Sequence, residues 1–415
     1  MIAHAAADAV SLAGTLTAAA AAATPWQAVV VGAGPAGAAT AWRLAARGLR
    51  VLLVDRGRLP RWKVCGCCLS PRACAELSGL GPAALPEVAG SLDTVVVLHR
   101  GRLVRLPLPA GRVISRDALD VGLARGAIGA GVEWLPDAHV AAVRDGSSAA
   151  PLEVVIESRG TTSARQLVVQ ADRVILATGL VDHVRTAGSA AAEARAGRRI
   201  ARGSLVGLGA VLAAGAAHLP PGELVMAVGR RGYCGLVRLE DGRIDVAAAV
   251  ERAAIAVAGG PAGAVAGLLR EAAGCGGVPH EADILAAAFQ ATPALTRRAP
   301  PVAGPTQRIL RVGDAAGYVE PFTGEGIGWA LAGARILAES VADSRGLHAP
   351  AEAARRYVFA HRRLFGPLHV RCGIVTAGLR WPIVVAAALA AAQCAPGAAR
   401  RLVSALVGAA AGGAS

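Results

Sequence analysis

A glycine-rich turn between two short apolar runs constrains the fold of this chain more than any other feature. The apolar run 28–31 leads into Gly32-Ala33-Gly34-Pro35-Ala36-Gly37, a helix pattern continues to Arg47, and a second apolar run, 51–54, ends at Asp55. Strand, turn, helix and strand in this order make a βαβ unit, and such crossovers build doubly wound parallel sheets. The sequence therefore predicts an α/β fold with a Rossmann-like domain.

The spacing within this turn predicts a dinucleotide site. Gly32 permits a tight turn, Gly34 lets a pyrophosphate approach the backbone, and Gly37 lets the helix pack closely against the strand. The helix N-terminus presents its partial positive charge to the phosphates. Asp55 ends the second strand, where its carboxylate can accept hydrogen bonds from a ribose, and we include the adjacent Arg56 in this site. The alternative is a glycine-rich turn that binds another ligand.

A second glycine-rich segment follows a strand pattern at 309–312. It begins with Gly313-Asp314 and continues to Pro321-Phe322-Thr323-Gly324-Glu325-Gly326, which opens a helix expected over 324–339. Asp314 can bind polyol hydroxyls. The positive end of the helix suits an anionic ring system such as a reduced flavin. The two motifs together are far more specific than either alone.

These motifs resemble those of the FAD-dependent oxidoreductases of the aromatic-hydroxylase fold, and most closely those of the geranylgeranyl reductase family. Three stretches carry the closer resemblance: Pro60-Arg61-Trp62-Lys63-Val64-Cys65-Gly66, Ala177-Thr178-Gly179 with Arg185, and Asp314 through Ile327. The resemblance covers roughly residues 26–345. It implies FAD as cofactor and NAD(P)H as electron donor, with an electron-donor protein as the alternative.

The resemblance also implies roles for individual residues. Arg116, at the start of a helix expected over 116–129, would reach the pyrophosphate or ribityl chain of FAD; the alternative for it is a solvated residue. Arg61 and Lys63 would bind substrate or donor, and Cys65 and Tyr233 are the catalytic candidates. The residues implied to hold FAD are Gly32, Gly34, Gly37, Asp55, Arg56, Arg116, Gly313, Asp314, Pro321, Gly324, Gly326 and Ile327.

Two segments depart from the family pattern. In the segment A-D-G-x-x-S, Thr178 replaces the acid and Asp182 replaces the serine. The substrate-domain pattern Y-x-W-x-F-P keeps only Tyr233, and the halogenase pattern W-x-W-x-I-P is absent from the sequence. Because that domain shapes the substrate pocket, these departures leave the substrate open.

The order of strand and helix patterns predicts five segments. These are an Ala-rich extension (1–25), the first part of the FAD-binding domain (26–190), a substrate domain with an antiparallel sheet (191–300), the return of the FAD-binding domain (301–345) and C-terminal helices (346–415). A strand pair near 92–108 is assigned to the substrate domain, a β-meander is expected over 138–172, and a separate strand is expected over 173–177. The extension lacks a basic start, so we do not expect a signal peptide.

Charge and hydropathy do not decide whether the protein contacts a membrane surface. The formal charge is +14 and the pI is about 10.7, yet Lys63 is the only lysine and the arginines are dispersed, which a GC-rich coding sequence alone can produce. The apolar segment 373–392 is interrupted by Arg380 and Pro382. We favour a buried helix pair there over a surface that touches a bilayer. The expected location is cytoplasmic, with peripheral contact at the inner membrane surface as the alternative.

The cysteine pattern does not indicate a metal centre. Cys65 and Cys68 form C-x-x-C, with Cys67 between them, but a zinc or iron–sulfur site needs two more ligands at suitable spacing. Cys65 is interpreted as a proton donor or site-shaping residue, with a redox dithiol or simple packing as alternatives. Only 3% of residues are aromatic, which argues against a nucleic-acid binder that stacks bases.

The sequence therefore predicts an FAD-dependent oxidoreductase. The favoured reaction is reduction of a carbon–carbon double bond in a small apolar substrate, either isoprenoid or polyketide- or lipid-like. One alternative is a monooxygenase that uses NAD(P)H and O2 on the same FAD frame. The other is a flavin-fold protein that binds membranes without catalysis.

Overall fold

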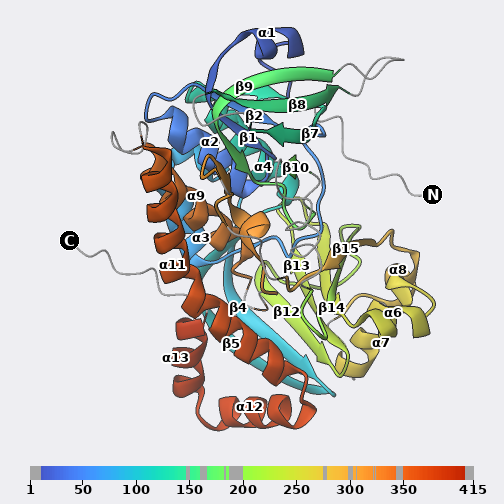
Figure 1. Ribbon diagram of the computed structural model, residues 1–415. Helices are drawn as coiled ribbons and strands as arrows, with labels where there is room; N and C mark the ends of the chain where they lie inside the picture. Colours follow the sequence, from blue (N-terminus) through green and yellow to red (C-terminus); the bar gives the residue numbers. More distant parts are fainter. Residues whose placement is uncertain are drawn as a thin grey trace.

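The computed structural model describes residues 11–145, 150–158, 166–181, 184–186, 200–273, 278–297, 302–304, 306–320, 322, 324–342 and 349–406. Two eight-stranded sheets organise these residues, one above the other in Figure 1, with helices packed on both. The α/β class with a Rossmann-like unit and a C-terminal helical segment is confirmed.

The first sheet is parallel around β1 (Trp26–Val31) and antiparallel at one side. On either side of β1 lie β2 (Val51–Val54) and β9 (Gln166–Leu176), both parallel to it. β6 (Glu133–Leu135) extends the sheet beyond β2, and β16 (Ile309–Arg311) also pairs with β9. The remaining strands are β7 (Ala138–Arg144), β8 (Leu152–Ser158) and β10 (Arg185–Thr186).

The long strand β9 corrects one expectation. The meander strand ending at 170 and the strand expected over 173–177 are a single strand, because the sequence between them contains no glycine or proline to break it. Its first half pairs with β8 in the meander, and its second half pairs with β1 and β16 in the parallel region. One strand therefore joins the antiparallel meander to the parallel region of the same sheet, which carries the glycine turn.

The second sheet has the order β15-β11-β14-β13-β12-β4-β5-β3. It takes β3, β4 and β5 from the first half of the chain, since the hairpin of β4 and β5 pairs with β12 rather than with the first sheet. Its strands are β3 (Cys68–Leu69), β4 (Gly90–His99), β5 (Arg102–Val113), β11 (Val206–Leu212), β12 (Gly222–Gly229), β13 (Gly232–Arg238), β14 (Ile244–Val250) and β15 (Gln290–Ala294).

The two faces of the second sheet have different neighbours. Alternate residues of β14, including Ile244, Val246 and Ala248, pack in one core with α7 (Pro261–Ala273), beside which lie α6 (Arg252–Val257) and α8 (Glu281–Ala286). Side chains alternate across a strand, so Asp245 and Ala247 point to the opposite face. That face meets the segment that contains Cys65.

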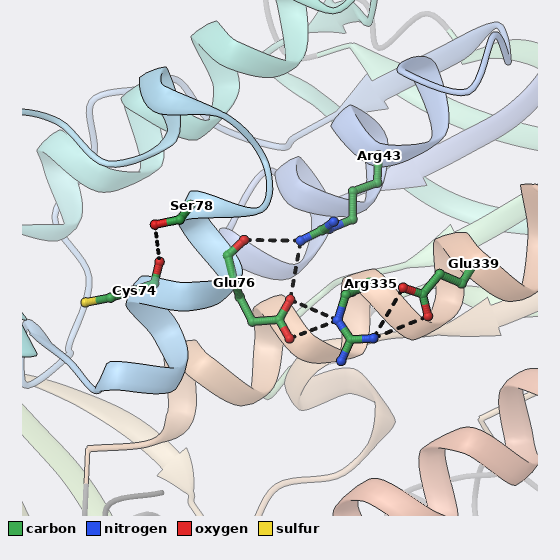
Figure 2. Close-up of polar contacts among 6 residues, drawn as sticks. All are labelled: Arg43, Cys74, Glu76, Ser78, Arg335 and Glu339. Atoms are coloured by element: carbon green, nitrogen blue, oxygen red, sulfur yellow. Dashed lines mark hydrogen bonds and ion pairs between the residues drawn. The ribbon is translucent and has the colours of Figure 1, made fainter. Parts of the chain in front are cut away.

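Four helices around the first sheet are α2 (Pro35–Ala45), α3 (Pro71–Ser78), α4 (Arg116–Gly129) and α9 (Gly326–Ala342), and a buried carboxylate joins three of them. Figure 2 shows Glu76 of α3 between Arg43 of α2, at 3.3 Å, and Arg335 of α9, at 3.0 Å. Arg335 also pairs with Glu339 one turn along α9. Glu76 and Arg43 are nearly buried, and the two ion pairs link α2, α3 and α9.

The smaller elements lie at the margins of these layers. Of the Ala-rich extension, residues 18–23 form the short helix α1 (Ala18–Ala23) against the first sheet. Single 3-10 turns are η1 (Pro82–Ala84) and η2 (Gly313–Ala316).

The C-terminal segment is a bent series of helices. These are α11 (Pro350–Leu379), α12 (Pro382–Cys394) and α13 (Pro396–Leu406), and the Tyr357 hydroxyl of α11 donates a 2.6 Å hydrogen bond to the Arg311 carbonyl. Among the described residues no single helix is long and apolar enough to cross a membrane, although α11 and α12 pass that test together across a 102° bend. The favoured buried pair is wrong in part, since Val385 is buried but Ile383 is 84% exposed.

Candidate active site

The first glycine turn is built as close approach requires. Gly32 has φ +105°, and a Cβ there would lie 2.4 Å from the Ala177 carbonyl oxygen. A Cβ at Gly37 would lie 1.8 Å from the Gly32 carbonyl oxygen, so the turn and α2 touch without room for a side chain. Gly34 caps α2 with no side-chain hydrogen bond, which leaves backbone N–H groups of the first turn available to an anion.

Asp55 organises the end of β2. Its Oδ2 accepts a 2.8 Å hydrogen bond from the Ala33 N–H, and its Oδ1 accepts hydrogen bonds from the Gly57 N–H at 2.9 Å and from Arg61 at 3.1 Å. The carboxylate therefore joins the glycine turn to the segment that follows β2. Oδ2, which accepts a single hydrogen bond, keeps a second lone pair for a ribose hydroxyl. Arg56 is exposed at the same strand end.

The segment from Arg61 to Gly66 lies between the two sheets. Its even-numbered residues face the second sheet: a Cβ at Gly209 of β11 would lie 3.0 Å from Val64 and 3.3 Å from Trp62, and a Cβ at Gly66 would lie 4.0 Å from Ala247. Its odd-numbered residues, Arg61, Lys63 and Cys65, face the FAD motifs, as the following contacts show. Sequence reasoning assigned Arg61 and Lys63 to substrate or donor binding; in the structure Arg61 contacts Asp55 and Lys63 contacts Asp120.

Two cations meet one buried carboxylate beside Gly34. Lys63 Nζ lies 2.8 Å from Asp120 Oδ2, and the Arg116 guanidinium contacts the same carboxylate at 2.9 and 3.1 Å. A Cβ at Gly34 would lie 3.7 Å from Lys63 Nζ and 3.9 Å from Arg116 Nη2. Burial opposes ionisation of Asp120, but Arg116 and Lys63 outweigh it and lower the pKa of Asp120. The fixed pair of cations suits a pyrophosphate.

Cys65 lies next in this cluster and has an acidic thiol. A hydrogen bond from the Cys67 side chain, with the nearby charge of Arg116, lowers the pKa of Cys65 to about 6 against the opposing effect of burial. The same hydrogen bond, together with burial, raises the pKa of Cys67 well above its ordinary value. A thiolate at Cys65 is therefore stabilised from two sides.

Asp245 faces this cluster from the second sheet. It is 1% exposed, and the Cys67 thiol lies beside its carboxyl group as a hydrogen-bonding neighbour. Burial, then the negative charge of a Cys65 thiolate, raises the pKa of Asp245 well above its ordinary value. The raised pKa favours the neutral form of Asp245 beside an ionisable thiol. Sequence reasoning did not select it, since an isolated acid in a β-hairpin carries no signal.

The second glycine motif packs against the first. A Cβ at Gly313 would lie 2.7 Å from the Ala36 Cβ in the first turn of α2, and a Cβ at Gly324 would lie 3.7 Å from the Cys68 Cβ. Desolvation raises the pKa of Asp314 to about 6 despite the nearby Arg116. Gly326 begins α9, and Ile327 is buried in its first turn. Pro321 lies outside the described residues.

A tyrosine–carboxyl pair lies beside the second glycine motif. The Tyr233 hydroxyl hydrogen-bonds to the Glu320 carboxyl, and the Tyr233 ring meets the Phe322 ring edge-on at 4.9 Å. Burial raises the pKa values of both Tyr233 and Glu320. Tyr318 lies near both Asp314 and Cys65, and burial raises its pKa as well. Tyr318 of the second motif therefore lies near both catalytic candidates, Cys65 and Tyr233.

Three site residues were not selected from the sequence although a signal was present. Asp120 follows Arg116 by one helical turn, which is the spacing of an ion pair on one helix face. Tyr318 and Glu320 lie inside the second motif. In the described part of the chain, no group of three or more His, Cys, Asp or Glu residues is arranged to hold a metal ion.

These residues fit FAD. The uncapped N-terminus of α2 and the Lys63–Arg116 pair match a pyrophosphate, Asp55 matches a ribose, and Asp314 matches the ribityl chain. Both motifs, which are nearly 300 residues apart in the chain, contact each other at Ala36 and Gly313. The arrangement is therefore that of an FAD-dependent enzyme.

Comparisons with known proteins agree. The FAD dependent oxidoreductase family matches residues 27–64. Menaquinone reductase of Mycolicibacterium smegmatis is 31% identical over 344 residues, covering 75% of each chain. Geranylgeranyl diphosphate reductase of Rhodobacter capsulatus is 31% identical over 166 residues, which is 39% of each chain.

Solved structures show the same fold. A flavoprotein/dehydrogenase from Cytophaga hutchinsonii has a TM-score of 0.72 at 15% identity, with 92% of each chain covered. A geranylgeranyl bacteriochlorophyll reductase-like protein from Thermoplasma acidophilum has a TM-score of 0.66 at 18% identity and covers 86% of this chain and 88% of its own. The chain belongs to the geranylgeranyl reductase-like family of FAD-dependent oxidoreductases, which includes menaquinone reductase.

Proposed function

We propose that this enzyme reduces a carbon–carbon double bond in a substrate that carries an isoprenoid chain, with NAD(P)H as electron donor. The observation that carries the proposal is the position of Cys65, an acidic thiol on the FAD-facing side of the segment between the two sheets. Menaquinone and geranylgeranyl diphosphate, named in the two relatives, share an unsaturated isoprenoid chain. The apolar surroundings of Tyr233 and Phe322 suit such a chain.

In this proposal, one group of residues binds the cofactor and Cys65 acts on the substrate. FAD, when bound and reduced, supplies hydride. Lys63 and Arg116 neutralise its phosphates, and Asp55 and Asp314 orient its ribose and ribityl hydroxyls. The Cys65 thiol donates a proton to the carbon next to the one that accepts hydride, and Cys67 and Arg116 stabilise the thiolate that remains.

The charge balance at Arg116 adjusts this thiol. Arg116 is shared between Asp120 and Cys65, so a phosphate bound beside it weakens its hold on the thiolate. Bound FAD is therefore expected to raise the pKa of Cys65 and keep more of it protonated, as a proton donor requires.

Reoxidation of the flavin under nitrogen tests the reaction. The purified protein is reduced with NADPH until its absorbance is bleached, or with dithionite if NADPH does not react and a donor protein is needed. Addition of a geranylgeranyl-chain substrate should restore the oxidised spectrum without oxygen. A flavin that stays reduced until air is admitted, with an oxygenated product, would identify a monooxygenase instead.

Replacement of Cys65 tests its role within that reaction. Cys65→Ser should retain FAD and its reduction by the donor, yet slow reoxidation by substrate by ~100-fold, within the range contributed by a general acid. Cys74→Ser on α3 is the matched control and should react normally. Normal reoxidation by Cys65→Ser at full flavin content would remove Cys65 from the mechanism.

A further inference from the structure

The outer face of α12 is apolar and unpartnered among the described residues. The helix Pro382–Cys394 contains no charged side chain, and Ile383 and Val384 are exposed on it. Trp381, at the start of α12, is 68% exposed, and Ile374, in the last turns of α11, is also exposed. These four side chains, Ile374, Trp381, Ile383 and Val384, we call the elbow patch.

The charged side chains in the segment that carries the elbow patch have one sign. Residues 353–406 contain no Asp or Glu. They contain eight arginines: Arg355, Arg356, Arg362, Arg363, Arg371, Arg380, Arg400 and Arg401. Arg371, Arg400 and Arg401 are exposed, and Arg380 holds the elbow by donating a 2.6 Å hydrogen bond to the Gly203 carbonyl. Since no acid offsets these arginines within the segment, its net positive charge matches an anionic surface.

The inner face of α12 belongs to the core that reaches the site. Val385 and Leu389 pack in one cluster with Met226 and Val228 of β12, and Tyr233 and Phe322 pack against the same cluster. Apolar side chains therefore run without interruption from α12 to the substrate side of the flavin motif. In Figure 1, α12 lies at the bottom edge of the molecule, beside the ends of β4 and β5 and far from α1.

We propose that the elbow patch docks on the surface of an anionic phospholipid bilayer. Ile374, Trp381, Ile383 and Val384 enter the boundary between headgroups and acyl chains, and the exposed arginines contact the anionic headgroups. The apolar core behind α12 then lies between the bilayer and Tyr233. Delivery of an isoprenoid chain along this core rests on the proposed function, whereas docking does not.

Sedimentation with vesicles tests docking. The full-length, FAD-containing protein is mixed with vesicles of phosphatidylglycerol and phosphatidylcholine, or of phosphatidylcholine alone. Wild type should sediment mainly with the anionic vesicles, and Ile383→Glu/Val384→Glu should bind them at least ~10-fold more weakly, since burial of each aliphatic side chain contributes at least that factor. Arg400→Gln/Arg401→Gln should weaken only the binding to anionic vesicles.

A matched control exists on the opposite side of the second sheet. Val257 of α6 is 81% exposed, so Val257→Glu introduces the same charge at a similar side chain and should bind vesicles like wild type. Flavin content and melting temperature confirm that each variant is folded. Wild type that stays in the supernatant, or equal loss in Val257→Glu, would overturn the proposal. A dimer that Ile383→Glu/Val384→Glu dissociates, without vesicle binding, would assign the patch to a second copy of the chain.

Turnover separates docking from the proposed reaction. Ile383→Glu/Val384→Glu should reduce a short-chain substrate dispersed in detergent at the wild-type rate, yet lose most activity on the same isoprenoid chain embedded in anionic vesicles. Equal activity on vesicle-embedded substrate would contradict delivery through the docked face. Absence of turnover in wild type with either substrate would contradict the proposed function, and vesicle binding would still decide the docking proposal.

Discussion

The ammonium group of Lys63 lies 2.8 Å from the fully buried carboxylate of Asp120, which also holds Arg116 one helical turn away. One acid therefore sets the position of both cations beside Gly34. Lys63 is the only lysine of the chain, and this contact places it at the predicted pyrophosphate site.

Replacement of Asp120 should therefore destabilise the protein and weaken FAD binding together. Asp120→Asn leaves two buried cations without their counter-charge, and we expect a loss of ~3–5 kcal/mol in the free energy of unfolding at neutral pH. Because the pKa of Asp120 is lowered in the fold, its ion pairs stabilise the protein above about pH 4 and lose that effect as pH falls further. Chemical denaturation across pH measures this.

The exposed Asp241 provides the comparison for that experiment. It also pairs with an arginine, Arg243, but the two side chains are 43% and 31% exposed to water. Asp241→Asn should cost less than ~1 kcal/mol. If Asp120→Asn destabilises the protein no more than Asp241→Asn does, the buried carboxylate does not hold the two cations.

The glycines of the first turn should separate cofactor binding from folding. A Cβ at Gly34 makes ordinary contacts in the protein, 3.7 Å or more from its neighbours, but it occupies the surface where a pyrophosphate must approach. Gly34→Ala should fold with the melting temperature of the apoprotein and lose FAD. Gly37→Ala, whose Cβ would lie 1.8 Å from a carbonyl oxygen, should fail to give stable protein. A yellow Gly34→Ala protein would refute the assignment of this turn.

The thiol of Cys65 should show its pKa of about 6 by chemical labelling. In the apoprotein, alkylation of Cys65 should increase with pH and level off near neutrality, since the thiolate is the reactive form. Cys67→Ala removes the main stabilising hydrogen bond and should move this profile to higher pH. Mass spectrometry of the labelled peptide measures the rate, with the exposed Cys394 as internal reference. Identical profiles would mean that Cys67 does not act on Cys65.

The buried acid Asp245 should lower stability at neutral pH. Its folded pKa is raised, so it favours the fold only below its ordinary pKa and costs stability as pH rises from there toward the raised value. Asp245→Asn keeps the shape and removes the ionisable proton, and should raise the melting temperature at pH 8 more than at pH 4. Infrared spectra should also lose a protonated-carboxyl band in this variant. A lower melting temperature at pH 8 would contradict a neutral carboxylic acid at this position.

Sequence reasoning predicted the parts of the fold that depend on local pattern. The βαβ unit, the helix from Arg116 and the glycine loop before α9 are each specified by neighbouring residues, so their existence and order could be read directly. Whether 166–176 forms one strand or two could not, because its two halves pair with different strands. The burial of α12 depends on how far the second sheet extends beneath it.

The site shows the same division. Motif spacing selected Gly32, Gly34, Asp55 and Asp314, each of which is positioned by the backbone of its own motif. The orientation of Arg61, Lys63 and Cys65 toward the cofactor depends on the alternation of an extended segment between two sheets, and Asp245 reaches Cys65 only through tertiary packing. Such contacts join residues far apart in the chain and leave no local pattern.

The mass of the product formed under nitrogen tests the central claim most directly. Reduced, FAD-containing enzyme is mixed with a geranylgeranyl-chain substrate in the absence of oxygen. Mass spectrometry gives the mass and amount of the extracted lipid product, and absorbance gives the amount of flavin reoxidised. A gain of two hydrogen atoms for each flavin reoxidised is the result that we predict. An unchanged lipid under nitrogen, followed by a gain of one oxygen atom when air is admitted, would contradict it.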